Sequence, residues 1–186
     1  MTRILSNLTF LFLLFSLTTR GQNTPSVSDK FFDFLNNYQI DSLRNLLTDD
    51  FQLKRTYTTY FNDKSSFLEN YLPNSKNYNG KYEILKVITD IEPQQFLVED
   101  QSDYLKYLKV DYPTWKITIS IEDNKIRQVT IDTTETYKKY SANIKVADEI
   151  FMAWLKANYP EDTQEILYNQ EGLLVKRLKE YAEKKK

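Results

Sequence analysis

The stretch YPTWKITISIEDNKIRQVTID, residues Tyr112 to Asp132, gives the clearest indication of how this chain folds. Two runs rich in Ile, Val and Thr flank a polar segment around Asp123 and Asn124, which is typical of a β-hairpin. Successive side chains of a strand point to opposite faces, and the apolar residues here fall on odd positions: Trp115, Ile117, Ile119, Ile121, Val129 and Ile131. The stretch therefore predicts a hairpin with one buried face.

The shared parity also predicts the length of the loop. Residues of equal parity pair across two strands only if an odd number of residues separates the strands, so we expect a three-residue loop of Glu122, Asp123 and Asn124. Asn124 is expected in the left-handed conformation, which asparagine tolerates better than most residues. The opposite face is polar apart from Ile126: Lys116, Thr118, Ser120, Gln128, Thr130 and Asp132.

Composition excludes several kinds of functional site. The 186 residues contain no His and no Cys, so a site cannot use imidazole, thiolate or a disulfide. With 3 glycines, the chain also lacks the glycine-rich loops that bind phosphates. The formal net charge of −1 does not favour nucleic acid. We expect no cofactor, no metal and no nucleic-acid partner, which leaves Asp, Glu, Tyr, Lys and Arg as candidate functional residues.

The first 21 residues have the pattern of a secretory signal peptide. Arg3 supplies a positive start, residues 8–17 (LTFLFLLFSL) form a hydrophobic run, and Thr19 and Gly21 are small residues before an expected cleavage at Gln22. A membrane anchor is the alternative, but the run is about half the roughly 20 residues that a helical span needs. The sequence predicts an exported protein, periplasmic or secreted, with no membrane segment after cleavage.

The remaining chain divides into three parts: a flexible leader over 22–28, a folded domain over 29–135 and a C-terminal helical extension over 136–186. In the domain, apolar periodicity predicts helices from about Asp29 to Tyr38, over 41–47 and over 62–72, the last ended by Pro73. Strands are predicted over 51–60, 81–91 and 96–100, followed by a short helix over 102–108 and the hairpin.

The strand over 81–91 carries apolar residues on both faces, which favours a central position in the sheet. In the extension, helices are expected over 143–158, 162–168 and 173–181, after a polar connector over 133–142. The order of elements predicts an α+β fold in which helices gather on one face of a curved antiparallel sheet.

Several strings resemble the nuclear transport factor two-like superfamily, also called SnoaL-like, and within it an exported bacterial branch with a C-terminal helical extension. The strings are FLNNYQIDSLRNLLTDDFQL (34–53), FNDKSSFLENYL (61–72), SDYLKYL (102–108), PTWKITISIEDNKI (113–126), NKIRQVTID (124–132) and FMAWLKANYPEDTQEILYNQEG (151–172). The resemblance implies a cone-shaped curved antiparallel sheet packed by the N-terminal helices, with a small-molecule pocket inside the cone. It also implies a homodimer through the polar sheet face around Thr118, Ser120, Gln128 and Thr130.

Enzymes of this superfamily include ketosteroid isomerases, polyketide cyclases, dehydratases and epoxide hydrolases, which use pocket Asp, Tyr, His or Arg. An ungapped alignment anchored on four residues places the general base of the isomerases at Arg55 and the hydrogen-bonding tyrosine of their first helix at Phe31. The four residues are Leu35, Leu46, Asp49 and Asp50. A guanidinium does not abstract a proton at neutral pH, and a phenyl ring does not donate a hydrogen bond. The isomerase mechanism is therefore not expected, mechanisms that need His are excluded, and we assign no catalytic residue.

Arg55 is the leading candidate for ligand binding. It falls on the apolar side of its predicted strand, so its charge is expected to point into the cone, where it needs an anion. That anion is either a carboxylate of the chain, such as Glu83 or Asp100, or a carboxylate of a ligand. The remaining alternative is that Arg55 reaches out at the mouth of the pocket. Three aromatic residues are expected either to line the same cavity or to pack in the core: Tyr57, Tyr104 and Trp115.

Three functions remain open. The leading hypothesis is an exported protein, non-enzymatic or of uncharacterised activity, that binds a small, mostly apolar ligand in the cone, and this ligand is an acid if Arg55 holds it. The second is a lyase, isomerase or hydrolase of the same fold that uses Asp, Tyr or Arg. The third is an interaction module that forms a homodimer through the polar sheet face.

Overall fold

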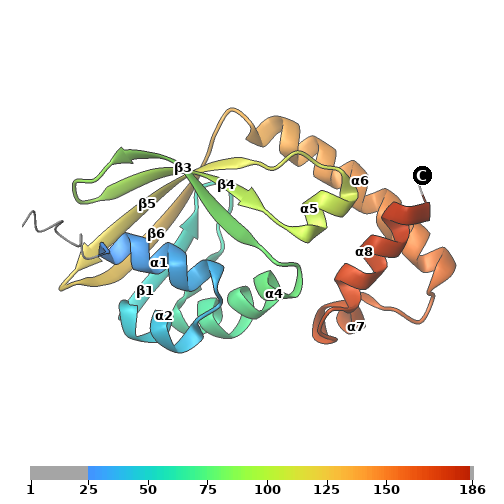
Figure 1. Cartoon of the computed structure of the whole chain (residues 1–186), viewed down its shortest axis with the longest axis horizontal. Helices are drawn as coiled ribbons and strands as arrows, with labels where there is room; N and C mark the ends of the chain where they lie inside the picture. Colours follow the sequence, from blue (N-terminus) through green and yellow to red (C-terminus); the bar gives the residue numbers. More distant parts are fainter. Residues whose placement is uncertain (1–24, 185–186) are drawn as a thin grey trace, which may run out of the picture.

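The structure is a computed structural model that describes residues 25–184, so the predicted signal peptide and the first residues of the leader lie outside it. Six strands form one sheet with the order β2-β1-β6-β5-β4-β3 (Figure 1). The strands are β1 (Leu47–Arg55), β2 (Phe61–Asp63), β3 (Lys81–Thr89), β4 (Gln94–Gln101), β5 (Thr114–Glu122) and β6 (Lys125–Thr133).

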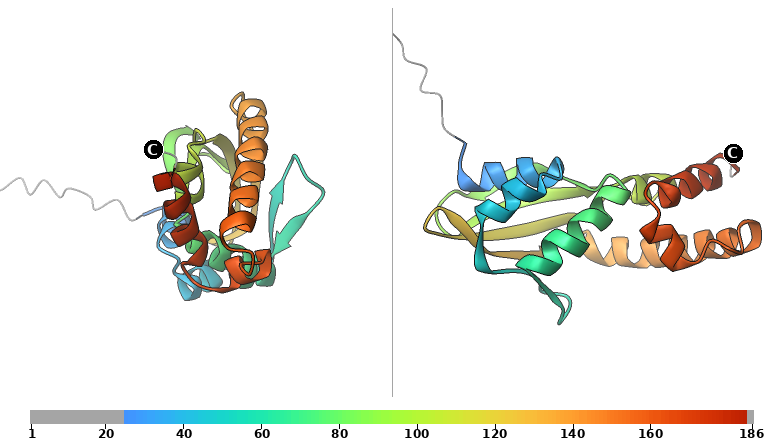
Figure 2. Two further views of the ribbon diagram at one scale, coloured as in Figure 1. Left: turned by 90° about the vertical axis from the view of Figure 1, so that its right-hand side faces the viewer. Right: turned by 90° about the horizontal axis from the view of Figure 1, so that it is seen from below.

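Helices from the N-terminal half cover one face of this sheet, and the C-terminal helices lie at one end of it (Figures 1 and 2). The first group is α1 (Val27–Asn36), α2 (Ile40–Leu46) and a helical stretch made of α3 (Lys64–Ser66), η1 (Phe67–Tyr71) and α4 (Leu72–Asn77). The second group is α6 (Tyr137–Asn158), α7 (Gln164–Asn169) and α8 (Leu173–Lys184), which α5 (Asp103–Leu108) joins to the sheet.

The predicted α+β class, with N-terminal helices on a curved sheet, is confirmed. The sheet is mixed rather than antiparallel throughout, because β1 runs parallel to β6 while the other neighbouring strands run antiparallel. The free edge of β6 is available to β1, whose apolar residues Phe51 and Leu53 then join the buried face. The prediction of a purely antiparallel sheet missed the parallel pairing of β1 with β6.

The predicted inward face of the hairpin is confirmed, but the register differs from the one that a loop of residues 122–124 would give, which would pair Ile117 with Val129. Ile117 lies opposite Ile131 and Ile119 lies opposite Val129, so the odd positions of β5 and β6 share one face. All four side chains are buried. They pack beneath the apolar residues of α1, α2 and the helical stretch of residues 64–77 and form the larger of the two cores.

The predicted three-residue loop is wrong. The hairpin turns on two residues, Asp123 and Asn124, whose φ angles are 49° and 59°, as in the type I′ turns that suit the twist of two strands. The extra residue that parity requires is instead accommodated in β6, where the register shifts beside Arg127. This bulge turns Ile126 from the polar face to the core, where it is 0% exposed.

Pro73 does not end its helix. A proline lacks an N–H and clashes with the carbonyl four residues earlier, which here belongs to Glu69. Glu69 lies in the π-helical turn η1, where backbone hydrogen bonds join residues five apart instead of four. The α-helical hydrogen bond that Pro73 would break is therefore not required at this point. The helix therefore continues to Asn77, five residues beyond its predicted end at residue 72.

The strand β3 lies at the edge of the sheet, not at its centre. Its apolar residues on both faces remain from 37% to 52% exposed: Ile84, Leu85, Val87 and Ile88. The start of this edge is covered by α1, because the Asn36 side chain bonds both the N–H and the carbonyl of Tyr82 at 2.8 Å. Apolar residues on both faces of a strand therefore do not by themselves establish a central position.

Other boundaries move by shorter distances. Helix α1 begins at Val27, inside the predicted leader, because Ser26 and Asp29 form a capping box. The strand β1 ends at Arg55, and a turn precedes β2 where the sequence predicted strand up to Tyr60. Helix α6 begins at Tyr137, within the predicted polar connector.

A second core holds the C-terminal helices. Phe151 and Leu155 of α6 pack with Leu174 and Leu178 of α8 and with Leu105 of α5. The division into a domain and an extension stays a prediction, as does a homodimer through the polar sheet face. Within residues 25–184 none of the helices is both long and apolar enough to cross a membrane.

The bulge makes Ile126 and Ile88 a test of the fold. Ile126→Ala should lower the free energy of unfolding by about 2–5 kcal/mol, because it leaves a cavity in the core. The matched control Ile88→Ala, on the exposed β3, should change it by no more than about 0.5 kcal/mol. Urea unfolding followed by tryptophan fluorescence measures both. Equal losses for the two variants would contradict the inward turn of Ile126.

Candidate ligand-binding site

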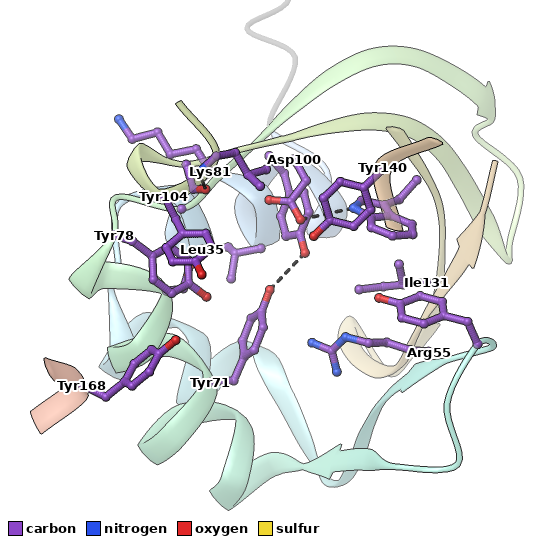
Figure 3. A pocket seen from close by; sticks show the side chains of 17 residues that line it. Leu35, Arg55, Tyr71, Tyr78, Lys81, Asp100, Tyr104, Ile131, Tyr140 and Tyr168 are labelled. Atoms are coloured by element: carbon purple, nitrogen blue, oxygen red, sulfur yellow. Dashed lines mark hydrogen bonds between the residues drawn. The ribbon is translucent and has the colours of Figure 1, made fainter. Parts of the chain in front are cut away.

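A cavity of about 280 Å³ opens where the apolar core of the sheet meets the C-terminal helices (Figure 3). This volume is at the small end of the range for ligand pockets, so a ligand that fits is small. Apolar side chains form part of the wall: Leu35, Leu105, Trp115 and Ile131. Seven tyrosines form much of the rest: Tyr57, Tyr71, Tyr78, Tyr82, Tyr104, Tyr140 and Tyr168.

All four residues that the sequence singled out line this cavity: Arg55, Tyr57, Tyr104 and Trp115. Arg55 is the last residue of β1, and Tyr57 follows in the turn, where its ring stacks on Trp115 with 5.3 Å between the ring centroids. Tyr104 comes from α5 and donates a hydrogen bond to Asp148 of α6. Their role in ligand binding stays a prediction.

The guanidinium of Arg55 has polar neighbours but no carboxylate. Its Nη1 donates to Oδ1 of Asn62 at 3.1 Å, and its Cζ lies 5.1 Å from the centre of the Tyr71 ring. Among residues 25–184, Arg55 forms no ion pair. The expected partner Glu83 accepts a hydrogen bond from Gln101 instead. Pairing of Arg55 with Glu83 or Asp100 is therefore wrong.

Arg55 nevertheless stays charged. Burial by itself lowers the pKa of the guanidinium, but the facing tyrosines, chiefly Tyr71, more than offset this and the pKa is raised overall. The cavity therefore contains a permanent positive charge next to aromatic rings.

Asp100 supplies the opposite charge from β4. The indole nitrogen of Trp115 donates to its Oδ2 at 3.2 Å. Burial raises the pKa of Asp100 to about 6, although the Trp115 hydrogen bond and the charge of Arg55 pull it down. Asp100 thus gains and loses its proton close to neutral pH, an unusual property for an aspartate.

The tyrosine hydroxyls fall into two groups. Those of Tyr71 and Tyr82 bond each other at 3.0 Å, and that of Tyr104 bonds Asp148. Four others that line the cavity have no hydrogen-bond partner within residues 25–184: Tyr57, Tyr78, Tyr140 and Tyr168. Burial raises the pKa of Tyr57 and of Tyr140 to about 12, so these hydroxyls remain protonated and able to donate.

Sequence reasoning missed most of these tyrosines. Tyr71 has the spacing of a core residue on its helix, Tyr140 falls in the predicted connector, and Tyr168 belongs to a distant helix. One signal was present: the chain has 14 tyrosines against 11 phenylalanines. A buried tyrosine requires a partner for its hydroxyl, so an excess of tyrosine favours a polar cavity over a dry core.

Nothing in the described part of the chain suggests a metal centre. Acidic side chains do not gather into a possible metal site anywhere in residues 25–184. Among the described residues that line the cavity, Asp100 is the one with a carboxylate. The described residues of the cavity wall therefore offer a guanidinium, a titrating carboxyl and several phenols, together with the hydroxyls of Ser75 and Ser102 and the side chain of Lys81.

Known proteins resemble this chain in structure but not in sequence. Neither a protein-family model nor a curated protein matches it. A candidate polyketide cyclase from Sinorhizobium meliloti has 15% identity over 58% of this chain and 94% of its own, with a TM-score of 0.49. A candidate ketosteroid isomerase from Kribbella flavida has 14% identity over 59% of this chain and 76% of its own, with a TM-score of 0.49. A nuclear transport factor two-like protein of unknown function from Cytophaga hutchinsonii has 12% identity over 59% and 91%, with a TM-score of 0.44.

The raised pKa of Asp100 predicts how stability depends on pH. Below about pH 4 the carboxyl is protonated in both the folded and the unfolded chain. Between that pH and 6 the folded chain binds more protons, so stability falls as pH rises. Asp100→Asn keeps an acceptor for the indole N–H of Trp115 and removes the free-energy cost of ionising a buried carboxyl. At pH 8 the free energy of unfolding of the variant should exceed that of the wild type by up to about 3 kcal/mol.

Urea unfolding at pH 4 and at pH 8 checks this prediction. The gap between Asp100→Asn and the wild type should close at the lower pH. The control Asp90→Asn, at an exposed carboxylate, should show no such trend. A gap of the same size at both values of pH would contradict a raised pKa.

Proposed function

We propose that this protein binds a small organic acid in the cavity, as an exported member of the nuclear transport factor two-like superfamily. The order of elements, the curved sheet and the strings quoted above support the superfamily. One observation carries the binding proposal: Arg55 is charged, half-buried in the cavity wall, and forms no ion pair within residues 25–184.

A carboxylate is the natural partner of such a group. A buried charge without a partner costs free energy, and the planar guanidinium binds a carboxylate through two parallel hydrogen bonds. The guanidinium of Arg55 points toward the centre of the cavity, whereas the amino group of Lys81 points away from it (Figure 3). A bound acid would therefore place its carboxylate at Arg55.

The remaining wall suits the body of such an acid. The stacked rings of Tyr57 and Trp115 provide a flat aromatic surface beside Arg55. Leu35 and Ile131 add aliphatic contact. A compact acid with a planar or cyclic body fits these walls better than a long flexible chain, given the small volume.

Binding of benzoate tests the proposal. Wild-type protein should bind benzoate more tightly than the neutral benzamide, and Arg55→Ala should weaken benzoate binding by about 10-fold to 100-fold, because a hydrogen bond to a charged group is lost. Benzamide binding should change little. Arg44→Ala, at an exposed position on α2, is the matched control. Isothermal titration calorimetry gives the affinities. An affinity for benzoate that Arg55→Ala leaves unchanged would contradict the proposal.

Catalysis is a second candidate function, and Asp100 favours it. A carboxyl with a pKa of about 6 can both accept and release a proton near neutral pH, as general acid–base catalysis requires. Native mass spectrometry of protein purified from its own cells, followed by incubation with the acid it carries, separates the two functions. If the wild-type protein returns the acid unchanged, binding alone is supported. If the wild-type protein converts the acid to a product and Asp100→Asn does not, the protein is a lyase, isomerase or hydrolase.

Export rests on the sequence of residues 1–21, which lie outside the described part of the chain. The mature chain is predicted to begin at Gln22, and mass spectrometry of the N-terminal peptide from the cell envelope and from the medium checks this. An intact chain from Met1 confined to the cytosol would contradict export.

A further inference from the structure

We infer that the acid carries oxygen atoms, as hydroxyl or carbonyl groups, at the end away from its carboxylate, and that the hydroxyls of Tyr78 and Tyr168 bind them. This inference rests on the proposed function, because Arg55 defines the end at which the carboxylate lies. It names a class of ligand, a small oxygen-rich acid, in place of the mostly apolar ligand that the sequence favoured.

The cavity has two ends of different chemistry. Arg55 lies at one side of the close-up view, and Tyr78, Tyr104 and Tyr168 lie together at the opposite side, with Tyr71 between (Figure 3). Among residues 25–184, the far end carries neither an arginine nor a carboxylate that lines the cavity, and the amino group of Lys81, which lies beside Tyr104, points away from the cavity. What it offers is a group of phenolic hydroxyls.

Two of these hydroxyls are unused. Tyr104 donates to Asp148, but Tyr78 and Tyr168 have no hydrogen-bond partner in the part of the chain that the structure describes. Water can bond them while the cavity is open, but an apolar ligand would displace that water and leave both hydroxyls unpaired, which is costly. A ligand with oxygen atoms at this end avoids the cost.

Both hydroxyls are suited to donating. Burial raises the pKa of Tyr78 and of Tyr168 above the usual range, so each keeps its proton at neutral pH. A protonated phenol donates one hydrogen bond, and ether, carbonyl and hydroxyl oxygens accept it. The recognised atoms are therefore acceptors on the ligand.

The two tyrosines are held in place by their backbones. The Tyr78 carbonyl accepts a hydrogen bond from the N–H of Asp103 at 2.8 Å. The Tyr168 carbonyl accepts from the side chain of Asn77 at 2.9 Å, which ties α7 to the end of α4. The C-terminal helices thus supply part of the binding wall, since Tyr168 belongs to α7 and Tyr140 to α6.

Two acids with the same ring test the inference: benzoate and 3,4,5-trihydroxybenzoate, titrated by calorimetry at pH 6.5. Wild-type protein should bind the trihydroxy acid at least about tenfold more tightly than benzoate, because the Tyr78 and Tyr168 hydroxyls can donate additional hydrogen bonds to it. In the double variant Tyr78→Phe/Tyr168→Phe this preference should fall to about threefold or less, while benzoate should bind at least as well as before. Retained benzoate binding also shows that the double variant is folded.

A matched control is Tyr107→Phe, on α5 but outside the cavity wall, which should keep the preference. Equal binding of the two acids by wild type, or a preference that survives in the double variant, would overturn this inference and leave the proposed function standing. Failure of both acids to bind wild type would overturn the proposed function and this inference with it.

Discussion

The apolar inward face of β5 and β6 has to be kept from water, and this constraint places most of the molecule. Helices α1 and α2 and the helical stretch of residues 64–77 cover that face, and β1 extends it by pairing with the free edge of β6. The side chains that pack over this face differ at the end where Trp115 and Ile131 lie. There the lining becomes tyrosines, and Arg55, opposite Ile131 in the register, enters a cavity instead of a core.

That cavity is costly to fold. It contains a guanidinium with no ion pair among residues 25–184, a carboxyl whose pKa burial raises to about 6, and hydroxyls without partners in the same range. Apolar residues of similar size would remove each of these costs. Groups held in unfavourable surroundings within a cavity are typical of functional sites, where a ligand provides the missing interactions.

Local patterns in the sequence predicted local features. Alternation predicted the inward face of the hairpin, and apolar periodicity predicted helices near residues 62 and 102, where the side chains of Asp63 and Ser102 cap the helices that follow. Arg55 stood out because a charge interrupts an apolar face. The β6 bulge and the passage of the helix through Pro73 depend on how the backbone adjusts to its surroundings. The tyrosines that line the cavity were missed, because the spacing of a tyrosine in an amphipathic helix is the same whether it packs in the core or lines a cavity.

A crystal structure of the protein with 3,4,5-trihydroxybenzoate tests the central claim most directly. The predicted result is an acid in the cavity with its carboxylate within hydrogen-bond distance of the Arg55 guanidinium, roughly 2.7–3.2 Å between nitrogen and oxygen, and with its ring hydroxyls toward Tyr78 and Tyr168. A cavity that holds only water at saturating acid, or an acid whose carboxylate lies away from Arg55, would contradict the claim.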